Sequence, residues 1–308
     1  MTLFTPEQVI AKLQQGQSWE QSELSCINLS GAILNQGNFT GAYLRKANFN
    51  QAACQETNFS YASLYFASFY DTNLVGANLR KAHLNNANLT KANLREVQAQ
   101  ETIFRWTILD EIDATSGQFA QALFVNAQGK EADFNSANLA KVDLSGSNFS
   151  QTDFTAAVLR QANFTKAILT QTVWHNTYLE QTIFSQADLN KADFKGANLV
   201  GANFQDAHLS VVSFEDAELQ QSIFSQAKLL EVNFTGASLF GANLEGANFS
   251  QVNFNEADLQ DANFENTFWQ AVNFKDCLVT GAEFTNAEGL TVEQKHWLKQ
   301  NGALNVPN

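Results

Sequence analysis

The chain has 308 residues, of which 44% are hydrophobic and 16% are charged. This balance excludes an intrinsically disordered chain, and the length allows a sizeable buried core. The formal net charge of −13 disfavours direct binding to nucleic acid or to an anionic membrane, because phosphate contact requires clustered Lys and Arg. The sequence contains no apolar run of about 18 residues, the length needed to cross a bilayer. Its first residues also lack the basic segment followed by an apolar segment that is typical of a secretion signal. We therefore expect a cytoplasmic protein that makes no membrane contact.

The first predicted element is a short capping helix within residues 1–21. Thr5 is a suitable N-cap, Pro6 suits the first helical position, and Gln8 completes a capping box with Thr5. Apolar residues follow at helical spacing, and Gly16 ends the segment.

A period of five dominates residues 22–289, as in the pentapeptides AYLRK, ANFNQ, ANLRK and AHLNN. Every fifth residue from Leu24 to Phe284 gives 53 centres, of which 46 are Leu or Phe, and a small residue usually lies two positions before the centre. A strand would alternate with a period of two and a helix with 3.6, so this period fits neither. The exceptions are Cys54, Ala99, Ala114, Gly129, Trp174, Trp269 and Val279.

Each pentapeptide is expected to form one straight side and one corner. The large centre and the small residue two positions earlier share the inward direction of an extended backbone, and the other three residues face water. Asn or Asp often precedes the centre, as at Asn48 and Asp153, and such side chains bond the backbone at turns. If four sides close one coil, residues 20 apart become neighbours, and the repeat forms roughly 13 coils.

These features resemble the pentapeptide-repeat family, whose motif is A(D/N)Lxx, over residues 22–287. The resemblance implies an all-β fold, a right-handed quadrilateral parallel β-helix. Such proteins are especially abundant in cyanobacteria, and their roles differ widely. The resemblance therefore predicts the fold and leaves the function open.

In this arrangement one column of centres is aromatic. We interpret it as packed interior rather than as a cofactor channel, and we expect no cofactor. The column consists of Phe134, Phe154, Trp174, Phe194, Phe214, Phe234, Phe254 and Phe274.

The pattern weakens between residues 99 and 129. Some centres lose bulk there, while Val97 and Ile112 replace small residues, an exchange that can conserve interior volume. The sequence leaves open whether the coils stay regular in this stretch. Ile103 and Trp106 add apolar side chains at outward positions, which is unfavourable on a solvated face unless something covers them.

A candidate partner-binding surface includes this stretch. Phe66 and Trp106 share one outward column, with Asn86 between them and Lys46 on the preceding coil. Aromatic residues and Arg together are typical of protein interfaces. The alternative is a scatter of exposed aromatic residues on a Phe-rich solenoid. The six candidate residues are Tyr43, Tyr65, Phe66, Ile103, Arg105 and Trp106.

The far part of the repeat is strongly acidic. Residues 131–288 hold twenty acidic and seven basic side chains, whereas residues 22–100 hold four acidic and six basic ones. Some acids lie 20 residues apart, where like charges repel unless a basic partner is present. The alternative is a solubilising surface. The acidic candidates are Asp216, Glu245, Glu256, Asp258, Asp261, Glu265 and Asp276.

The last predicted element is a second capping helix within residues 290–308. Thr291 and Gln294 repeat the capping box, Trp297 and Leu298 supply apolar anchors, and Gly302 ends the segment. This helix could cap the repeat or form a homodimer contact, and we favour the capping role. The chain is therefore expected to be a monomer, with a C-terminal homodimer as the alternative.

No residue set points to catalysis. Three cysteines without a CxxC spacing and four isolated histidines predict neither a disulfide frame nor a metal site. His83, His175 and His208 face outward without an evident Asp or Cys partner 20 residues away. An uninterrupted solenoid also offers few places for a pocket, so we expect no enzyme.

Two functions remain. The first is a non-catalytic scaffold whose flat sides bind an unidentified protein. The second is implied by the resemblance, since some family members mimic DNA in width and charge, bind DNA gyrase and protect it from quinolones. On that hypothesis the acidic residues would bind gyrase or another DNA-binding protein. The near-neutral first coils and the absence of a loop-forming interruption count against it.

Overall fold

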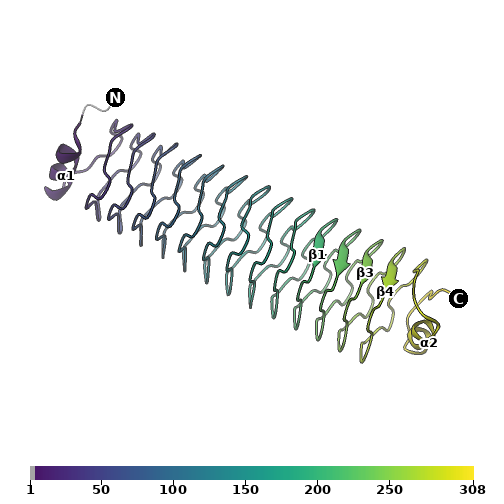
Figure 1. Ribbon diagram of the computed structural model, residues 1–308. Coiled ribbons are helices and arrows are strands. Elements are labelled where there is room, and N and C mark those ends of the chain that lie inside the picture. Colours follow the sequence, from purple (N-terminus) through teal and green to yellow (C-terminus); the bar gives the residue numbers. More distant parts are fainter. Residues whose placement is uncertain (1–3) are drawn as a thin grey trace. The chain divides into compact units, whose positions relative to one another are not determined.

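The computed structural model describes residues 4–308, and several of its helices and strands are labelled in Figure 1. The chain falls into two compact units, of which unit 1 ends at Val158 and unit 2 begins at Leu159. Unit 1 contains helix α1 (Pro6–Gln14), and unit 2 ends with helix α2 (Val292–Gln300). Unit 2 also contains four short strands, β1 (His208–Ser210), β2 (Lys228–Leu230), β3 (Asn248–Ser250) and β4 (Phe268–Gln270). These strands form a parallel sheet in the order β1-β2-β3-β4.

Each unit is a right-handed quadrilateral parallel β-helix, which confirms the fold implied by the resemblance to the pentapeptide-repeat family. Parallel bridges join residues 20 apart, as between Asn28 and Asn48 in unit 1 and between Leu209 and Leu229 in unit 2. The hydrogen bonds run in both directions between coils, since the Leu24 N–H donates to Tyr43 O and the Tyr43 N–H donates to Ser22 O. Four pentapeptides therefore complete one coil.

The corners have a uniform backbone geometry. In every pentapeptide from residue 21 to residue 286, the residue two positions after the centre has a positive φ. The centre's carbonyl accepts a hydrogen bond from the N–H three residues on, as between Leu24 and Ile27. The preceding Asn or Asp also bonds the turn, as where Asn38 Oδ1 accepts from the Thr40 N–H at 3.0 Å. The predicted role of these residues at the corners is confirmed.

The interior consists of the centres and the small residues two positions before them, which are almost entirely buried. The rings of the predicted aromatic column are stacked within each unit: centroids are 5.5 Å apart for Phe134 and Phe154 in unit 1, and 5.1 Å apart for Phe214 and Phe234 in unit 2. We number the four sides by their centres: side 1 carries residue 24 and every twentieth residue after it, side 2 starts at 29, side 3 at 34 and side 4 at 39.

The stretch of weakened pattern between residues 99 and 129 keeps regular coils. Its bridges continue at 20-residue spacing, and Val97 and Ile112 are buried as the volume exchange requires. At Gly129, the interior volume that a large centre would fill is taken by a residue of another coil. A Cβ at this position would overlap the ring of Phe149, which belongs to the next coil of the same side.

Both helices have the predicted caps. Thr5 and Gln8 form one capping box, and Thr291 and Gln294 form the other. Val9 on α1 is fully buried and its carbonyl accepts a hydrogen bond from the indole of Trp19 at 3.1 Å. No helix in residues 4–308 combines the length and the apolar character that crossing a membrane requires.

The end of unit 2 is covered by α2 and the tail behind it. Leu298 is fully buried, and Gln294 Nε2 donates a hydrogen bond to Val272 O at 2.9 Å. After α2, the backbone of Leu304 pairs with Glu283, which occupies hydrogen-bonding groups of the last coil. These contacts fit the capping interpretation of α2. The oligomeric state and the division at residues 21 and 289 stay predictions.

Candidate functional site

The six candidate interface residues lie on one side of unit 1. All are outward residues of side 1 or of the corner that follows it, on coils joined by bridges between Tyr43, Ser63, His83 and Ile103. The exposed fraction is 53% for Tyr43, 47% for Phe66 and 53% for Trp106, whereas Tyr65 and Ile103 are half-buried. The structure therefore brings these residues to one side, and their role in binding stays a prediction.

The charge on this part of side 1 is entirely positive. No carboxylate occupies an outward position of side 1 between Glu23 and Asp143. Within residues 4–308, Arg45, Lys46 and Arg105 form no ion pair. Three other basic residues of unit 1 are paired with a carboxylate on the next coil, and the N–O distances are 3.5 Å for Lys81–Glu101, 3.6 Å for Lys91–Glu111 and 3.4 Å for Arg95–Asp113.

Sequence reasoning missed two features beside this surface. His83 has a hydrogen-bond partner that is neither Asp nor Cys: its Nδ1 lies 2.9 Å from the hydroxyl oxygen of Tyr65, and the two rings meet edge to face. Tyr61, at the corner that precedes side 1, is the most exposed aromatic residue of the described chain at 61%, and Lys81 lies over its ring. Its position two residues after the centre Phe59 could have identified it.

The acidic candidates of unit 2 are spread over adjacent surfaces. Glu245 and Glu265 lie on neighbouring coils of side 1, as predicted, and Asp258 lies on side 4. Asp216 and Glu256 occupy the same corner, but the coil between them carries Gly236. Among the described residues, Asp276 is the one member of the set in an ion pair, at 3.7 Å from Lys275. Within residues 4–308 the other six carboxylates form no ion pair, although the charge of Asp216 contributes to the raised pKa of Lys195.

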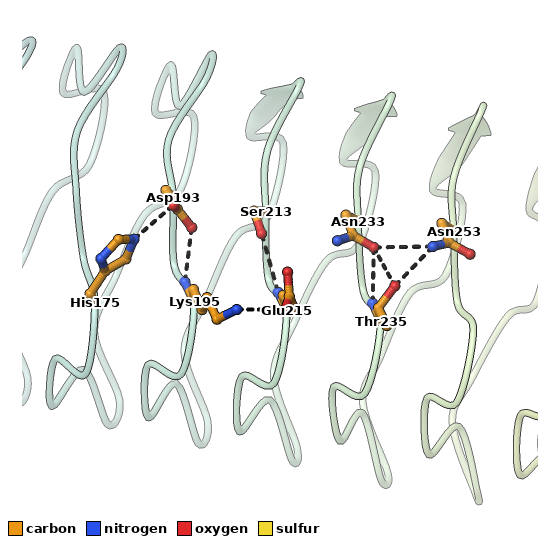
Figure 2. A network of polar contacts seen from close by, with 8 residues as sticks. All are labelled: His175, Asp193, Lys195, Ser213, Glu215, Asn233, Thr235 and Asn253. Atoms are coloured by element: carbon orange, nitrogen blue, oxygen red, sulfur yellow. Dashed lines mark hydrogen bonds and ion pairs between the residues drawn. The ribbon is translucent and has the colours of Figure 1, made fainter.

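Side 3 of unit 2 carries a chain of paired polar groups (Figure 2). His175 Nε2 lies 2.7 Å from Asp193 Oδ2, and Lys195 Nζ lies 2.6 Å from Glu215 Oε1. The hydrogen bond from Lys195 to Glu215, with the charge of Glu215, raises the pKa of Lys195 above its ordinary value. No acidic residue lies 20 positions from His175, so a spacing of one full coil predicts no partner, whereas the contact with Asp193 spans 18 residues. Since these groups satisfy one another, this network stabilises the stacking of coils.

Further along side 3 the network continues without charge. Asn253 Nδ2 donates to Asn233 Oδ1 at 3.2 Å and to Thr235 Oγ1 at 2.8 Å, so that neighbouring coils are joined by amide and hydroxyl groups (Figure 2). The side chain of Asn273 extends this chain by donating to Asn253 Oδ1.

The titratable groups with shifted pKa values do not resemble a catalytic set. Burial raises the pKa of the Cys54 thiol, and burial is also the main cause that raises the pKa of Cys277 to about 12, so neither is an activated nucleophile. A depression of about 300 Å³ beside α2 is lined by Phe274, Trp297 and Glu293. Backbone and Thr291 hydrogen bonds lower the pKa of Glu293, which makes it a poor proton donor. In residues 4–308, no three His, Cys, Asp or Glu residues are grouped as a metal site requires.

The sequence matches two family models. The model described as "Pentapeptide repeat region" matches residues 147–224, 167–244 and 217–293. The model described as "Pentapeptide repeats (8 copies)" matches residues 22–60, 38–74, 72–110 and 118–151. No curated protein matches the sequence.

Several solved structures are similar to this chain. HetL, a pentapeptide repeat protein involved in heterocyst differentiation regulation from the cyanobacterium Nostoc sp. strain PCC 7120, is 23% identical, with a TM-score of 0.30 over 91% of this chain and 96% of HetL. QnrB1, a plasmid-mediated fluoroquinolone resistance protein, is 19% identical, with a TM-score of 0.40 over 59% of this chain and 91% of QnrB1. Rfr23 from the cyanobacterium Cyanothece 51142 is 33% identical, with a TM-score of 0.24 over 31% of this chain and 62% of Rfr23.

Proposed function

Because this chain belongs to the pentapeptide-repeat proteins, we propose that it is a non-catalytic module that binds a partner protein through side 1 of unit 1. The observation that carries the proposal is the combination of exposed Tyr43, Phe66 and Trp106 with unpaired Arg45 and Arg105. Apolar side chains grouped on one exposed surface are typical of protein interaction sites. Aromatic residues and Arg supply most of the binding energy in protein interfaces.

The rigid frame adds to this proposal. The outward side chains of side 1 stand on coils joined by backbone hydrogen bonds in both directions, so a partner does not have to order a loop. Binding to a preorganised surface loses less conformational entropy, which favours affinity. The paired polar groups of side 3 lack the exposed aromatic residues and unpaired cations of side 1.

The test is affinity capture with the full chain and with single variants. Trp106→Ala and Phe66→Ser should each lose a partner from a cell extract without lowering the thermal midpoint. Tyr178→Ala is the matched control, because Tyr178 is an aromatic residue of unit 2 with 45% exposure, and this variant should retain the partner. A partner retained by all three variants would contradict the proposal, and a lowered midpoint in the first two would mark these residues as structural.

A second candidate function is supported by six carboxylates of unit 2 that form no ion pair in residues 4–308 and are spread over adjacent surfaces of this unit. On this hypothesis the surface takes the place of DNA on DNA gyrase or another DNA-binding protein. Glu245→Gln, Glu256→Gln, Asp258→Asn and Glu265→Gln in one chain should abolish gyrase binding and leave folding intact. An unchanged affinity for purified gyrase would exclude this function, and binding by the wild type should weaken as salt increases.

A further inference from the structure

Phe66 and Trp106 stand in the same column on side 1, two coils apart. Their φ angles are 59° and 56°, and Asn86 between them has a φ of 57°. Backbone hydrogen bonds join the three coils, from the Phe66 N–H to Asn85 O at 3.1 Å and from the Asn86 N–H to Arg105 O at 3.0 Å. Because the backbone geometry repeats, the Cα–Cβ bonds of Phe66, Asn86 and Trp106 point in the same direction.

Phe66 and Trp106 share the positive φ of every corner, so what sets them apart within their column is the exposed aromatic ring that each carries. The same column carries Lys46, Asn86 and Asn126 on other coils, which are polar. Among residues 4–308, neither Phe66 nor Trp106 stacks against another aromatic ring, whereas the rings of the interior are stacked throughout.

The coil between them presents two short amides. Asn86 is exposed, and Asn85 beside it is only 9% exposed. In the described part of the chain the Asn85 side chain makes no hydrogen bond, although Tyr65 and Arg105 flank it on the neighbouring coils. A short polar residue therefore lies between two larger aromatic ones, with a second amide recessed next to it.

We propose that Phe66 and Trp106, hereafter the aromatic pair, hold one aromatic side chain of an acidic protein segment between them, above Asn86. This inference rests on the proposed function and specifies the partner's chemistry. Two coils separate the aromatic pair by about 10 Å, given a strand spacing of about 4.8 Å. A ring placed midway lies about 5 Å from each of the two, within the range of favourable aromatic contacts.

The charges around the aromatic pair indicate the rest of the partner. Arg45 lies over the Phe66 ring at 5.9 Å, Lys46 precedes Phe66 in the column, and Arg105 is adjacent to Trp106. With no carboxylate on this part of side 1, Asp and Glu residues flanking the inserted ring would find unpaired cations. A nucleic acid strand fits less well, because residues 1–158 hold 14 acidic and 10 basic side chains, which disfavours a long polyanion.

The experiment uses short probes and full-length protein with ¹⁵N-labelled tryptophan. Trp106 gives a usable signal because its side chain is 53% exposed, whereas Trp19, Trp174 and Trp269 are buried. The main probe is the capped peptide Glu-Glu-Phe-Glu-Glu. Its controls are Glu-Glu-Ala-Glu-Glu, which lacks the ring, Gln-Gln-Phe-Gln-Gln, which lacks the charge, and a five-nucleotide oligothymidylate. The shift of the Trp106 indole N–H, assigned by its loss in Trp106→Phe, reports binding.

We expect the acidic Phe peptide to bind at least about tenfold more tightly than either peptide control or the oligonucleotide. The decisive variant is Asn86→Phe, which fills the position between the two rings and adds exposed aromatic surface. It should weaken binding of the acidic Phe peptide by about tenfold, as should Phe66→Ser. Arg105→Gln should reduce the preference for the acidic peptide over its Gln counterpart, because Arg45 and Lys46 remain.

Three outcomes would overturn the inference, and they differ from failure of the proposed function. Equal or tighter binding by Asn86→Phe would show that the exposed area, and not the space between the rings, carries recognition. Tighter binding of the oligonucleotide would assign the surface to nucleic acid. If no peptide shifts the indole signal, the aromatic pair does not hold such a ring, and the proposed function stands if the extract partner is still lost in Trp106→Ala.

Discussion

The ring of Phe149 occupies the space above Gly129 that a side chain at position 129 would otherwise fill. Gly129 is a centre of side 2, where most other coils carry Leu or Phe, and Phe149 is the centre of the next coil on the same side. Phe149 is fully buried, and its ring also lies 6.0 Å from that of Phe124. One large residue thus fills two positions of the column.

Restoring the repeat at this position is expected to destabilise the protein. Gly129→Leu introduces the commonest centre residue, but its side chain has to displace the Phe149 ring. Overpacking of this kind costs about 1–3 kcal/mol in free energy of unfolding. Chemical denaturation of the variant measures the loss. The double variant with Phe149→Leu should recover part of it, and a stabilised single variant would contradict this account of the packing.

A stabilising change is expected at a corner of unit 2. Val211 has a φ of 58° and, among residues 4–308, is the one β-branched residue with a positive φ. This conformation costs about 1–2 kcal/mol for an ordinary side chain and less for Asn. Val211→Asn should therefore raise the free energy of unfolding by about 1 kcal/mol. Val200→Asn is the control, since Val200 lies outside the positive-φ column, and an equal gain there would refute the argument from backbone strain.

The alternation of inward and outward residues can be tested with one charge at two adjacent positions. Leu199 is a fully buried centre of side 4, and Val200 is the next residue and is partly exposed. Leu199→Asp should destabilise the chain by about 3–5 kcal/mol, because it places an unpaired charge in the core. Val200→Asp should shift the thermal midpoint by no more than a few degrees. Similar midpoints for the two variants would mean that Leu199 is not packed as described.

The fold was predictable because the same signal recurs at 53 centres, so that a local exception such as Cys54 or Ala99 does not change the register. The helix caps were predictable for a different reason. The capping boxes of Thr5 and Thr291 are local, and the residues that satisfy one another are three positions apart.

Contacts between coils were harder to infer because more than one spacing is possible. A long side chain that follows a centre can contact the equivalent residue of the next coil, 20 positions later, as Lys195 contacts Glu215. It can also contact the residue before the next centre on that side, 18 positions later, as His175 contacts Asp193. The sequence does not say which contact forms. The same limit applies to Phe149, whose rotation towards Gly129 depends on the volume left by a residue in another coil.

The stability of the C-terminal end is expected to depend on pH through Glu283. Its Oε1 accepts a hydrogen bond from the Thr285 hydroxyl, and its Oε2 accepts one from Asn305 Nδ2 at 2.8 Å, which ties the tail to the last coil. The Thr285 side chain first, and then Asn305 and the backbone, lower the pKa of Glu283 below its ordinary value of 4.5. A lowered folded-state pKa contributes stability above the unfolded value and loses it as the pH falls through the folded one.

The comparison of Glu283→Gln with wild type tests this dependence. At neutral pH the variant should expose the backbone amides of residues 302–304 to faster hydrogen exchange, because the charged acceptor is replaced by a weaker neutral one. As the pH falls through the lowered folded-state pKa, the wild-type carboxyl itself becomes neutral, so the difference between the two proteins should shrink. Glu265→Gln is the control, since the Glu265 carboxylate makes no hydrogen bond in residues 4–308. A difference that stays constant from neutral to acidic pH would show that the contact between Glu283 and Asn305 owes nothing to the charge.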